Sequence, residues 1–321
     1  MMEEVGMGDK LFIGVDVSKD WLDVAVAGGA GSRQIGQGEA AITAWLAELD
    51  PAAVALVAFE PTGGYERELA ACLRRGGFRF MRVHPNEVAA FRTRRGVKAK
   101  TDAMDARLLA AFAAAELAGR EVRPAVEEDA TLREMTARRR QVLGALQAER
   151  CRLAMARTAV VRAGIAATIA LLGRELAALD AAIAAHIAAQ ARLARMAALL
   201  RSLKGVGPVT VATLLAELPE LGRLSGKQIA ALVGLAPRQR DSGRKRGRAS
   251  TGHGRPGVRQ VLFNAARIAI CHNPAMRAVY QRLSERNRRP GLVALTAVMR
   301  RMLVILNAIA RDGQPWKGLP A

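Results

Sequence analysis

An alternation of short apolar, β-rich runs with helical stretches over residues 11–83 constrains the fold of this chain more than any other feature. The first two runs flank a polar Ser-Lys-Asp turn, which is typical of a β-hairpin. Helical stretches separate the later runs, and this βαβ order predicts an α/β sheet. The predicted strands are residues 11–17, 21–27, 54–59 and 78–83, and the predicted helices between them are residues 40–49 and 65–76.

Two carboxylates occupy unusual places in these strands. Asp16 interrupts an otherwise apolar strand, where an unpaired carboxylate is costly unless it meets a cation. Glu60 directly follows the strand at residues 54–59, at the edge of an open α/β sheet where ligands usually bind. These positions make both residues candidates for one site.

A second pair of carboxylates lies in the stretch VKAKTDAMDARLLA, residues 97–110. Asp102 and Asp105 are three residues apart at the start of an apolar run, so a helix would direct both to the same place. Holding two like charges together is costly, and a divalent cation or a shared proton offsets that cost. The plainer interpretation is a helix N-terminus capped by Thr101, whose macrodipole the aspartates complement.

The four acidic residues come from a hairpin, a strand end and a following helix. Such an ordered set suits one or two Mg²⁺ ions, which polarise a phosphate and stabilise an oxyanion leaving group. Each residue alone would indicate little. Together, Asp16, Glu60, Asp102 and Asp105 predict a Mg²⁺-dependent phosphoryl-transfer site.

Residues 126–200 are rich in Ala, Leu and Arg and contain no proline. Apolar residues between positions 172 and 200 keep a 4,3 spacing, and His186 is a polar residue in the same register. A first helix is predicted from Ala130 to about residue 161, with a break at residues 163–164. We therefore expect an antiparallel helical hairpin or coiled coil that serves as spacer and oligomerisation arm, with His186 in its seam rather than on a metal.

The positive charge of the chain is concentrated in its last third. The formal net charge is +20; residues 1–200 carry 27 Lys and Arg against 24 Asp and Glu, and residues 201–321 carry 22 against 5. This excess indicates a polyanion partner. Residues 238–259 hold one acid and almost no large apolar residue, which predicts a solvated loop that wraps a phosphate backbone. Its candidate nucleic-acid ligands are Arg238, Arg240, Arg244, Lys245, Arg246, Arg248, Arg255 and Arg259.

Two serines, Ser242 and Ser250, share that cationic stretch. Surrounding cations would stabilise a serine alkoxide and the charge that develops on an attacked phosphate. Composition does not choose between the two serines, and a plain turn explains either.

The remainder of the last third is predicted to be helical. A Gly-Val-Gly turn at residues 205–207 feeds a helix and could present backbone N–H groups to a phosphate, or simply join two helices. Helices are predicted over residues 209–218, 226–233, 261–270 and 292–309.

Three motifs in order closely resemble those of the DEDD transposases of bacterial insertion sequences, described as bridge-RNA-guided recombinases. The motifs are Gly-Val-Asp-Val-Ser-Lys, Phe-Glu-Pro-Thr-Gly and Lys-Thr-Asp-Ala-Met-Asp-Ala-Arg. The family's C-terminal pattern, Gly-Leu-x-Pro-Arg followed by Ser-Gly, a basic tract, Ser, Gly and Arg, is present from Gly234 to Arg259. The resemblance runs from about residue 12 to about residue 307.

The resemblance implies an α/β plus α fold: an RNase H-like domain over residues 10–125, a coiled-coil arm over residues 126–200 and a mainly α C-terminal domain over residues 201–321. It implies RNA-guided, Mg²⁺-dependent DNA cleavage and strand exchange through a covalent serine–DNA intermediate. The implied partners are DNA, a guide RNA and further copies of the chain, as a dimer that assembles to a tetramer. The site residues it implies are Asp16, Glu60, Asp102 and Asp105 as metal ligands and Ser242 as nucleophile.

The residues alone leave two other functions open. One is a metal-dependent nuclease or Holliday junction resolvase that uses water in place of the serine. The other is a non-catalytic nucleic-acid-binding protein with structural acids.

Cysteine usage and hydropathy favour a cytoplasmic protein without a membrane span. The three cysteines are scattered and there are four histidines, which argues against a zinc site or a disulfide framework. The N-terminus lacks the apolar region of a signal peptide, and no apolar run reaches about 18 residues without a charge.

Overall fold

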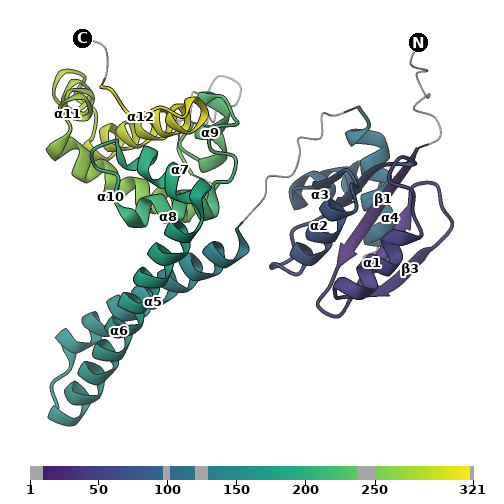
Figure 1. Cartoon of the computed structure of the whole chain (residues 1–321), viewed down its shortest axis with the longest axis horizontal. Coiled ribbons are helices and arrows are strands. Elements are labelled where there is room, and N and C mark those ends of the chain that lie inside the picture. The colour runs from purple at the N-terminus through teal and green to yellow at the C-terminus, as the bar shows by residue number, and fades with distance from the viewer. Residues whose placement is uncertain (1–9, 97–101, 120–128, 238–249, 253, 319–321) are drawn as a thin grey trace. The chain divides into compact units, whose positions relative to one another are not determined.

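A five-stranded mixed sheet organises the first part of the chain (Figure 1). The computed structural model describes residues 10–96, 102–119, 129–237, 250–252 and 254–318, and the chain divides into two compact units, residues 1–125 and 126–321. The strands are β1 (Leu11–Val17), β2 (Trp21–Val26), β3 (Ser32–Gly36), β4 (Val54–Phe59) and β5 (Phe80–Arg82). Their order in the sheet is β3-β2-β1-β4-β5, with β1 antiparallel to β2 and parallel to β4.

Helices cover both faces of this sheet. They are α1 (Glu39–Ala47), α2 (Glu66–Arg75), α3 (Pro85–Arg94), α4 (Asp102–Phe112) and the π-helix η1 (Ala113–Leu117). Val15 and Phe59 lie in the core shared with α1 and α2, whereas Leu56 and Ala58 pack with α3, α4 and η1. Because side chains alternate along a strand, Asp16 faces the side covered by α3 and α4.

The expected α/β plus α fold class is confirmed, and so are the hairpin of β1 and β2 and the strand β4. The sequence did not predict β3, an edge strand with a single buried residue, Ile35. It also missed α3, which follows β5 directly and begins at Pro85, a favoured first helical residue.

Helix α4 approaches β1 most closely at Gly14. A Cβ built there would lie 2.2 Å from the carbonyl oxygen of Ala106 and 2.2 Å from the backbone nitrogen of Ala110. Only glycine permits a helix backbone to come so near a strand. The contact fixes the beginning of α4, one turn before Ala106, over the face of the sheet that carries Asp16.

The second unit is entirely helical among the described residues except for a single bridge at Ser250. An elongated arm made of α5 (Ala130–Met155) and α6 (Ala159–Ala189) leads into a bundle of shorter helices (Figure 1). The bundle contains α7 (Ala191–Arg201), α8 (Pro208–Glu217), α9 (Gly226–Val233), α10 (Pro256–His272), α11 (Pro274–Gln281), the π-helix η2 (Arg282–Arg286) and α12 (Gly291–Asp312). One apolar core joins α7 to α12 through buried residues such as Leu200, Leu262 and Leu306.

The predicted helical hairpin is confirmed as α5 and α6, and its seam positions are buried or half-buried, with Ile183 the most enclosed. The second helix ends at Ala189 rather than continuing to residue 200, and the last seam positions, Leu193 and Leu200, are buried residues of α7. The predicted break at residues 163–164 is wrong. The first helix ends at Met155 and the chain turns at residues 156–158. Gly164 lies inside α6 with open space around it, and one helical glycine costs only about 1 kcal/mol.

A polar cluster closes the base of the arm. Asp129 caps α5 by accepting a hydrogen bond from the backbone N–H of Leu132 at 2.8 Å. Its other oxygen lies 2.8 Å from Nε2 of His186 and accepts from the amide of Gln190 at 3.0 Å. Burial alone would raise the pKa of Asp129, but these hydrogen bonds outweigh it and lower the pKa below its usual value. His186 thus contacts a carboxylate at the end of the seam.

We expect Asp129→Ala to lower the free energy of unfolding by about 1–2 kcal/mol at neutral pH, because it removes a helix cap and takes one hydrogen-bond partner from each of two half-buried side chains, His186 and Gln190. A carboxylate whose folded pKa is depressed stabilises the protein above its unfolded pKa, near 3.9, and loses that contribution as the pH falls toward the folded pKa. Urea unfolding of the full chain at neutral and acidic pH measures both effects. Glu134→Ala, an exposed acid on the next turn of α5, is the matched control; equal losses in the two variants would contradict the capping role.

Helix α12 has the length and apolar composition of a membrane span, and it is the one such helix among the described residues. However, 56% of its most apolar stretch is buried inside the protein. Ten of its residues, from Ala294 to Ile309, are buried in the bundle. Arg300 and Arg301 interrupt it and are exposed. These contacts are those of a core helix.

Candidate active site

The carboxylates of Asp16 and Glu60 lie on neighbouring strands of the sheet. Val15 of β1 is in register with Phe59 of β4, and the two acids are the next residues along these parallel strands. Both residues are half-buried. Side chains in register on adjacent parallel strands share a face, so Asp16 and Glu60 lie toward the same face of the sheet.

A buried carboxylate that the sequence analysis missed holds the loop after β4. Glu66, 7% exposed, accepts hydrogen bonds from the backbone N–H of Thr62 at 3.1 Å and of Gly64 at 2.9 Å. The loop between Glu60 and Glu66 is therefore tied to the first turn of α2. This arrangement fixes the direction in which the chain leaves β4, and with it the backbone of Glu60.

The second pair of acids begins α4. The backbone of Asp102 is the first residue of the helix, while its side chain lies outside the described part of the structure. Asp105 is mostly buried and forms an ion pair with Arg92 of α3. No local pattern predicts this pair, because nothing in the sequence distinguishes Arg92 from Arg94 of the same helix. A cation at Asp105 would share the carboxylate with this guanidinium or displace it.

A divalent cation fits the character of these donors. Carboxylate oxygens are the ligands that Mg²⁺ prefers, and Asp16 and Glu60 present two of them side by side. Within the described residues, no three His, Cys, Asp or Glu side chains lie close enough together to hold one ion. A complete metal site would therefore need Asp102, whose side chain is not described.

The serine predicted as nucleophile, Ser242, lies outside the described residues, as do the first six cations of the predicted nucleic-acid surface, Arg238, Arg240, Arg244, Lys245, Arg246 and Arg248. The chain on both sides of them is described. Gly234 ends α9 in a left-handed conformation, and its carbonyl accepts a hydrogen bond from the N–H of Gly252 at 3.1 Å. The two ends of the cationic stretch are thus joined.

The last two cations of that surface have partners within the protein. Arg255 forms two hydrogen bonds with the carboxylate of Glu220, at 2.5 and 2.6 Å, and donates to the carbonyl of Glu217. Arg259 donates to the carbonyl of Val233 at 2.9 Å. Both arginines therefore fasten α10 to the helices before it, a role that the cationic pattern alone did not indicate.

The Gly-Val-Gly turn has a packing explanation. Gly205 has a φ of +107°, and a Cβ there would lie 2.7 Å from that of Ala269. The turn joins α7 to α8 and lets α10 pack closely against it. Joining two helices, rather than binding a phosphate, is therefore sufficient to explain this turn.

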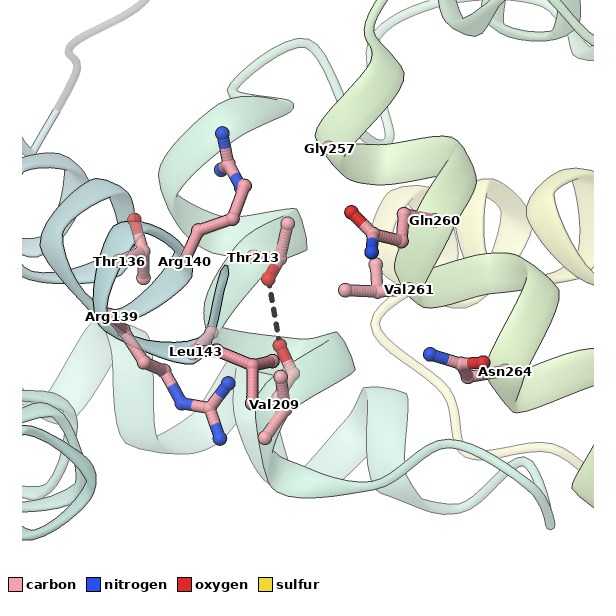
Figure 2. Close-up of a pocket in the computed structure, with 11 residues that line it drawn as sticks. Thr136, Arg139, Arg140, Leu143, Val209, Thr213, Gly257, Gln260, Val261 and Asn264 are labelled. Carbon is pink, nitrogen blue, oxygen red and sulfur yellow. Dashed lines mark hydrogen bonds between the residues drawn. The ribbon is translucent and has the colours of Figure 1, made fainter. Parts of the chain in front are cut away.

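A small pocket lies between α5, α8 and α10 (Figure 2). Its two guanidinium groups are engaged, Arg139 with Asp180 and Arg140 with Glu217. Gly257 forms part of the wall, where a Cβ would meet the Glu217 carboxylate at 2.4 Å. Thr213 donates to the carbonyl of Val209 at 2.9 Å, as drawn in Figure 2. The pocket is a junction between the arm and the bundle rather than a reactive centre.

Two family models match successive parts of the chain. A model of the DEDD transposases of IS110 elements matches residues 13–157, and a model described as the transposase IS116/IS110/IS902 family matches residues 197–281. The chain belongs to the IS110 family of transposases. The first match contains all four predicted acids and the second contains Ser242, so both candidate groups lie within family-specific regions.

Two relatives of this IS110-family transposase align over almost its whole length. They are the pilin gene-inverting proteins of Moraxella bovis and of Moraxella lacunata. Each is 26% identical over 318 residues, which cover 96% of this chain and 98% of the relative. The family makes the chain an enzyme that acts on DNA, a transposase of an insertion sequence, and its first unit is the RNase H-like α/β domain expected for the family.

Proposed function

We propose that this transposase is guided by an RNA and cuts and rejoins DNA through a covalent link to Ser242, with Mg²⁺ at Asp16, Glu60, Asp102 and Asp105. One observation carries the proposed metal site. Asp16 and Glu60 each follow a residue of the paired positions Val15 and Phe59 on the parallel strands β1 and β4, and α4 packs against β1 at Gly14. The +17 excess of the last third supports a surface for two nucleic acids. We place the enzyme in the cytoplasm, where its DNA is found.

The residues of the chain have distinct tasks in this proposal. The carboxylates would hold a divalent cation, which supplies electrostatic stabilisation of the charge on the scissile phosphate. Arginines and lysines of the stretch 238–248 hold the phosphate backbone next to Ser242 and favour its alkoxide. Arg255 and Arg259 fix the base of that stretch through Glu220 and Val233.

The serine step balances as a transesterification. The Ser242 oxygen forms a bond to phosphorus and loses its proton, while the phosphorus–oxygen bond to one side of the cut breaks and that oxygen leaves as a hydroxyl. A hydroxyl of another strand then attacks the phosphoserine, which restores a phosphodiester and frees the serine. Each step replaces one phosphate ester with another, so strand exchange requires no ATP. Inversion of a DNA segment, for which the two relatives are named, needs the same exchange within one molecule.

A search for protein covalently attached to DNA tests the serine. The full chain is expressed with a plasmid that carries its native flanking sequence, and denaturing gels are run for wild type, Ser242→Ala, Asp102→Asn and Ser250→Ala. We expect the adduct in wild type and Ser250→Ala and its complete loss in the other two variants. DNA cuts that persist in Ser242→Ala would instead identify metal-activated water as the nucleophile. Full binding and cutting by Asp102→Asn would contradict the metal site.

The same assay tests RNA guidance. Purified protein is incubated with the plasmid DNA with and without RNA transcribed from the flanking sequence. An adduct that forms equally well without the RNA would reject the guide but leave the serine chemistry in place.

A further inference from the structure

Asp23 is a buried carboxylate directly opposite Asp16. In the antiparallel pair of β1 and β2, Asp16 is in register with Asp23, and Asp23 is 7% exposed. Residues directly opposite on antiparallel strands point to the same face, with Cβ atoms about 5 Å apart. The two carboxylates are therefore neighbours on the face beneath α4.

The surroundings of Asp23 provide no compensation for its charge. Within the described part of the chain, Asp23 has neither a hydrogen-bond partner nor an ion-pair partner, unlike the equally buried Glu66, which accepts two backbone N–H groups. Its other cross-strand neighbour, Gln34 of β3, is uncharged. A buried carboxylate beside a second carboxylate is costly, because the charge loses its hydration and the two charges repel each other. A bound cation or a shared proton would remove that cost.

Asp23, Asp16 and Glu60 form a row across β2, β1 and β4, with Asp16 in the middle. Adjacent strands are about 4.8 Å apart, so the two outer acids are separated by roughly 10 Å. Among the described residues, no three acids lie close enough together to hold one ion. Asp16 is adjacent to both outer acids, so an ion that contacts Asp16 and Asp23 is distinct from one that contacts Asp16 and Glu60.

We propose that Asp23 is a further ligand of divalent cations in this site, and that Asp16 and Asp23 together hold an ion on the β2 side of Asp16. The inference rests on the proposed metal-dependent function and extends it by a fifth carboxylate. The proposal explains why β2 carries an aspartate at a buried position, where an apolar residue would cost the fold less free energy.

Cation binding and stability, measured without any DNA, test this proposal. Mn²⁺ binding to the full chain is measured by titration calorimetry, and thermal unfolding is followed with and without Mn²⁺. We expect Asp23→Asn to weaken Mn²⁺ affinity roughly tenfold or more and to lower the number of ions bound. We also expect Asp23→Asn to raise the unfolding temperature in the absence of metal, because it removes a buried like charge, and to reduce the rise that Mn²⁺ causes.

Asp20→Asn is the matched control, since Asp20 is an exposed aspartate in the turn of the same hairpin. It should bind and unfold like wild type. Wild-type Mn²⁺ binding that Asp23→Asn leaves unchanged would overturn the role of Asp23 and leave the proposed function intact. A variant that is stabilised without metal but binds Mn²⁺ normally would show that Asp23 adds like-charge repulsion to the site and is not a ligand. Failure of the wild type to bind Mn²⁺ would overturn the metal-dependent function itself.

Discussion

Replacing Gly14 with alanine should abolish DNA cleavage and lower the free energy of unfolding of the first unit by roughly 3 kcal/mol or more. The added methyl group would lie 2.2 Å from two backbone atoms of α4, the Ala106 oxygen and the Ala110 nitrogen. Neither atom belongs to a flexible side chain, so the helix as a whole must shift away from β1. That shift moves Asp102 and Asp105 relative to Asp16, and the candidate metal site comes apart. Thermal unfolding and the covalent-adduct assay measure the two effects.

Gly36→Ala is the control for Gly14→Ala. Gly36 also lies in the sheet, at the end of β3, but a Cβ there would meet only the Cβ of Ala41, at 3.6 Å, an ordinary contact. This variant should be as stable as wild type or more stable by up to about 1 kcal/mol, because alanine restricts the unfolded chain. If Gly14→Ala unfolds like Gly36→Ala and still forms the adduct, close approach of α4 is not required for the site.

The parts of the fold that the sequence predicted are those with strong periodicity. The hairpin and β4 are apolar patterns that were placed correctly, whereas the apolar seam predicted for the arm is divided between α6 and α7 at Gln190. Edge strand β3 pairs on one side only and buries one residue, so its sequence lacks the apolar pattern that predicts a strand. The turn between α5 and α6 was misplaced because glycine is a weak helix breaker, whereas the actual turn at residues 156–158 contains neither glycine nor proline.

The candidate site was predictable where a strand shows one anomalous residue. Asp16 and Glu60 stood out in this way, and the register of β1 and β4 places both toward the same face of the sheet. Asp23 was missed because its hairpin partner had not been identified; a four-residue turn at residues 18–21 would have placed it opposite Asp16. Arg92 acts through an ion pair between α3 and α4, which no local pattern predicts. Glu66 accepts backbone N–H groups two and four residues before it, in a loop whose course was not predicted. The role of Ser242 stays a prediction.

Replacing Gly254 with alanine should destabilise the second unit by about 2–3 kcal/mol and prevent formation of the DNA adduct. Gly254 has a φ of +65°, a conformation that side chains other than glycine rarely adopt. A Cβ there would also lie 2.4 Å from the carbonyl oxygen of Leu232, in the last turn of α9. The end of α9 and Gly254 flank the stretch with Ser242, and Gly234 and Gly252 are hydrogen-bonded between them. Separating these backbones would move both ends of that stretch.

Gly144→Ala is the control for Gly254→Ala, because it should stabilise the same unit rather than destabilise it. Gly144 lies inside α5 with open space around it, so alanine should raise the free energy of unfolding by about 1 kcal/mol and leave the adduct unchanged. Urea unfolding and adduct yield are measured for both variants. Loss of the adduct in Gly254→Ala while the protein remains folded at the assay temperature would show that the glycine positions the serine stretch. A normal adduct yield from a destabilised Gly254→Ala protein would mean that the contact between Gly254 and the end of α9 stabilises the fold but does not position Ser242 for its reaction with DNA.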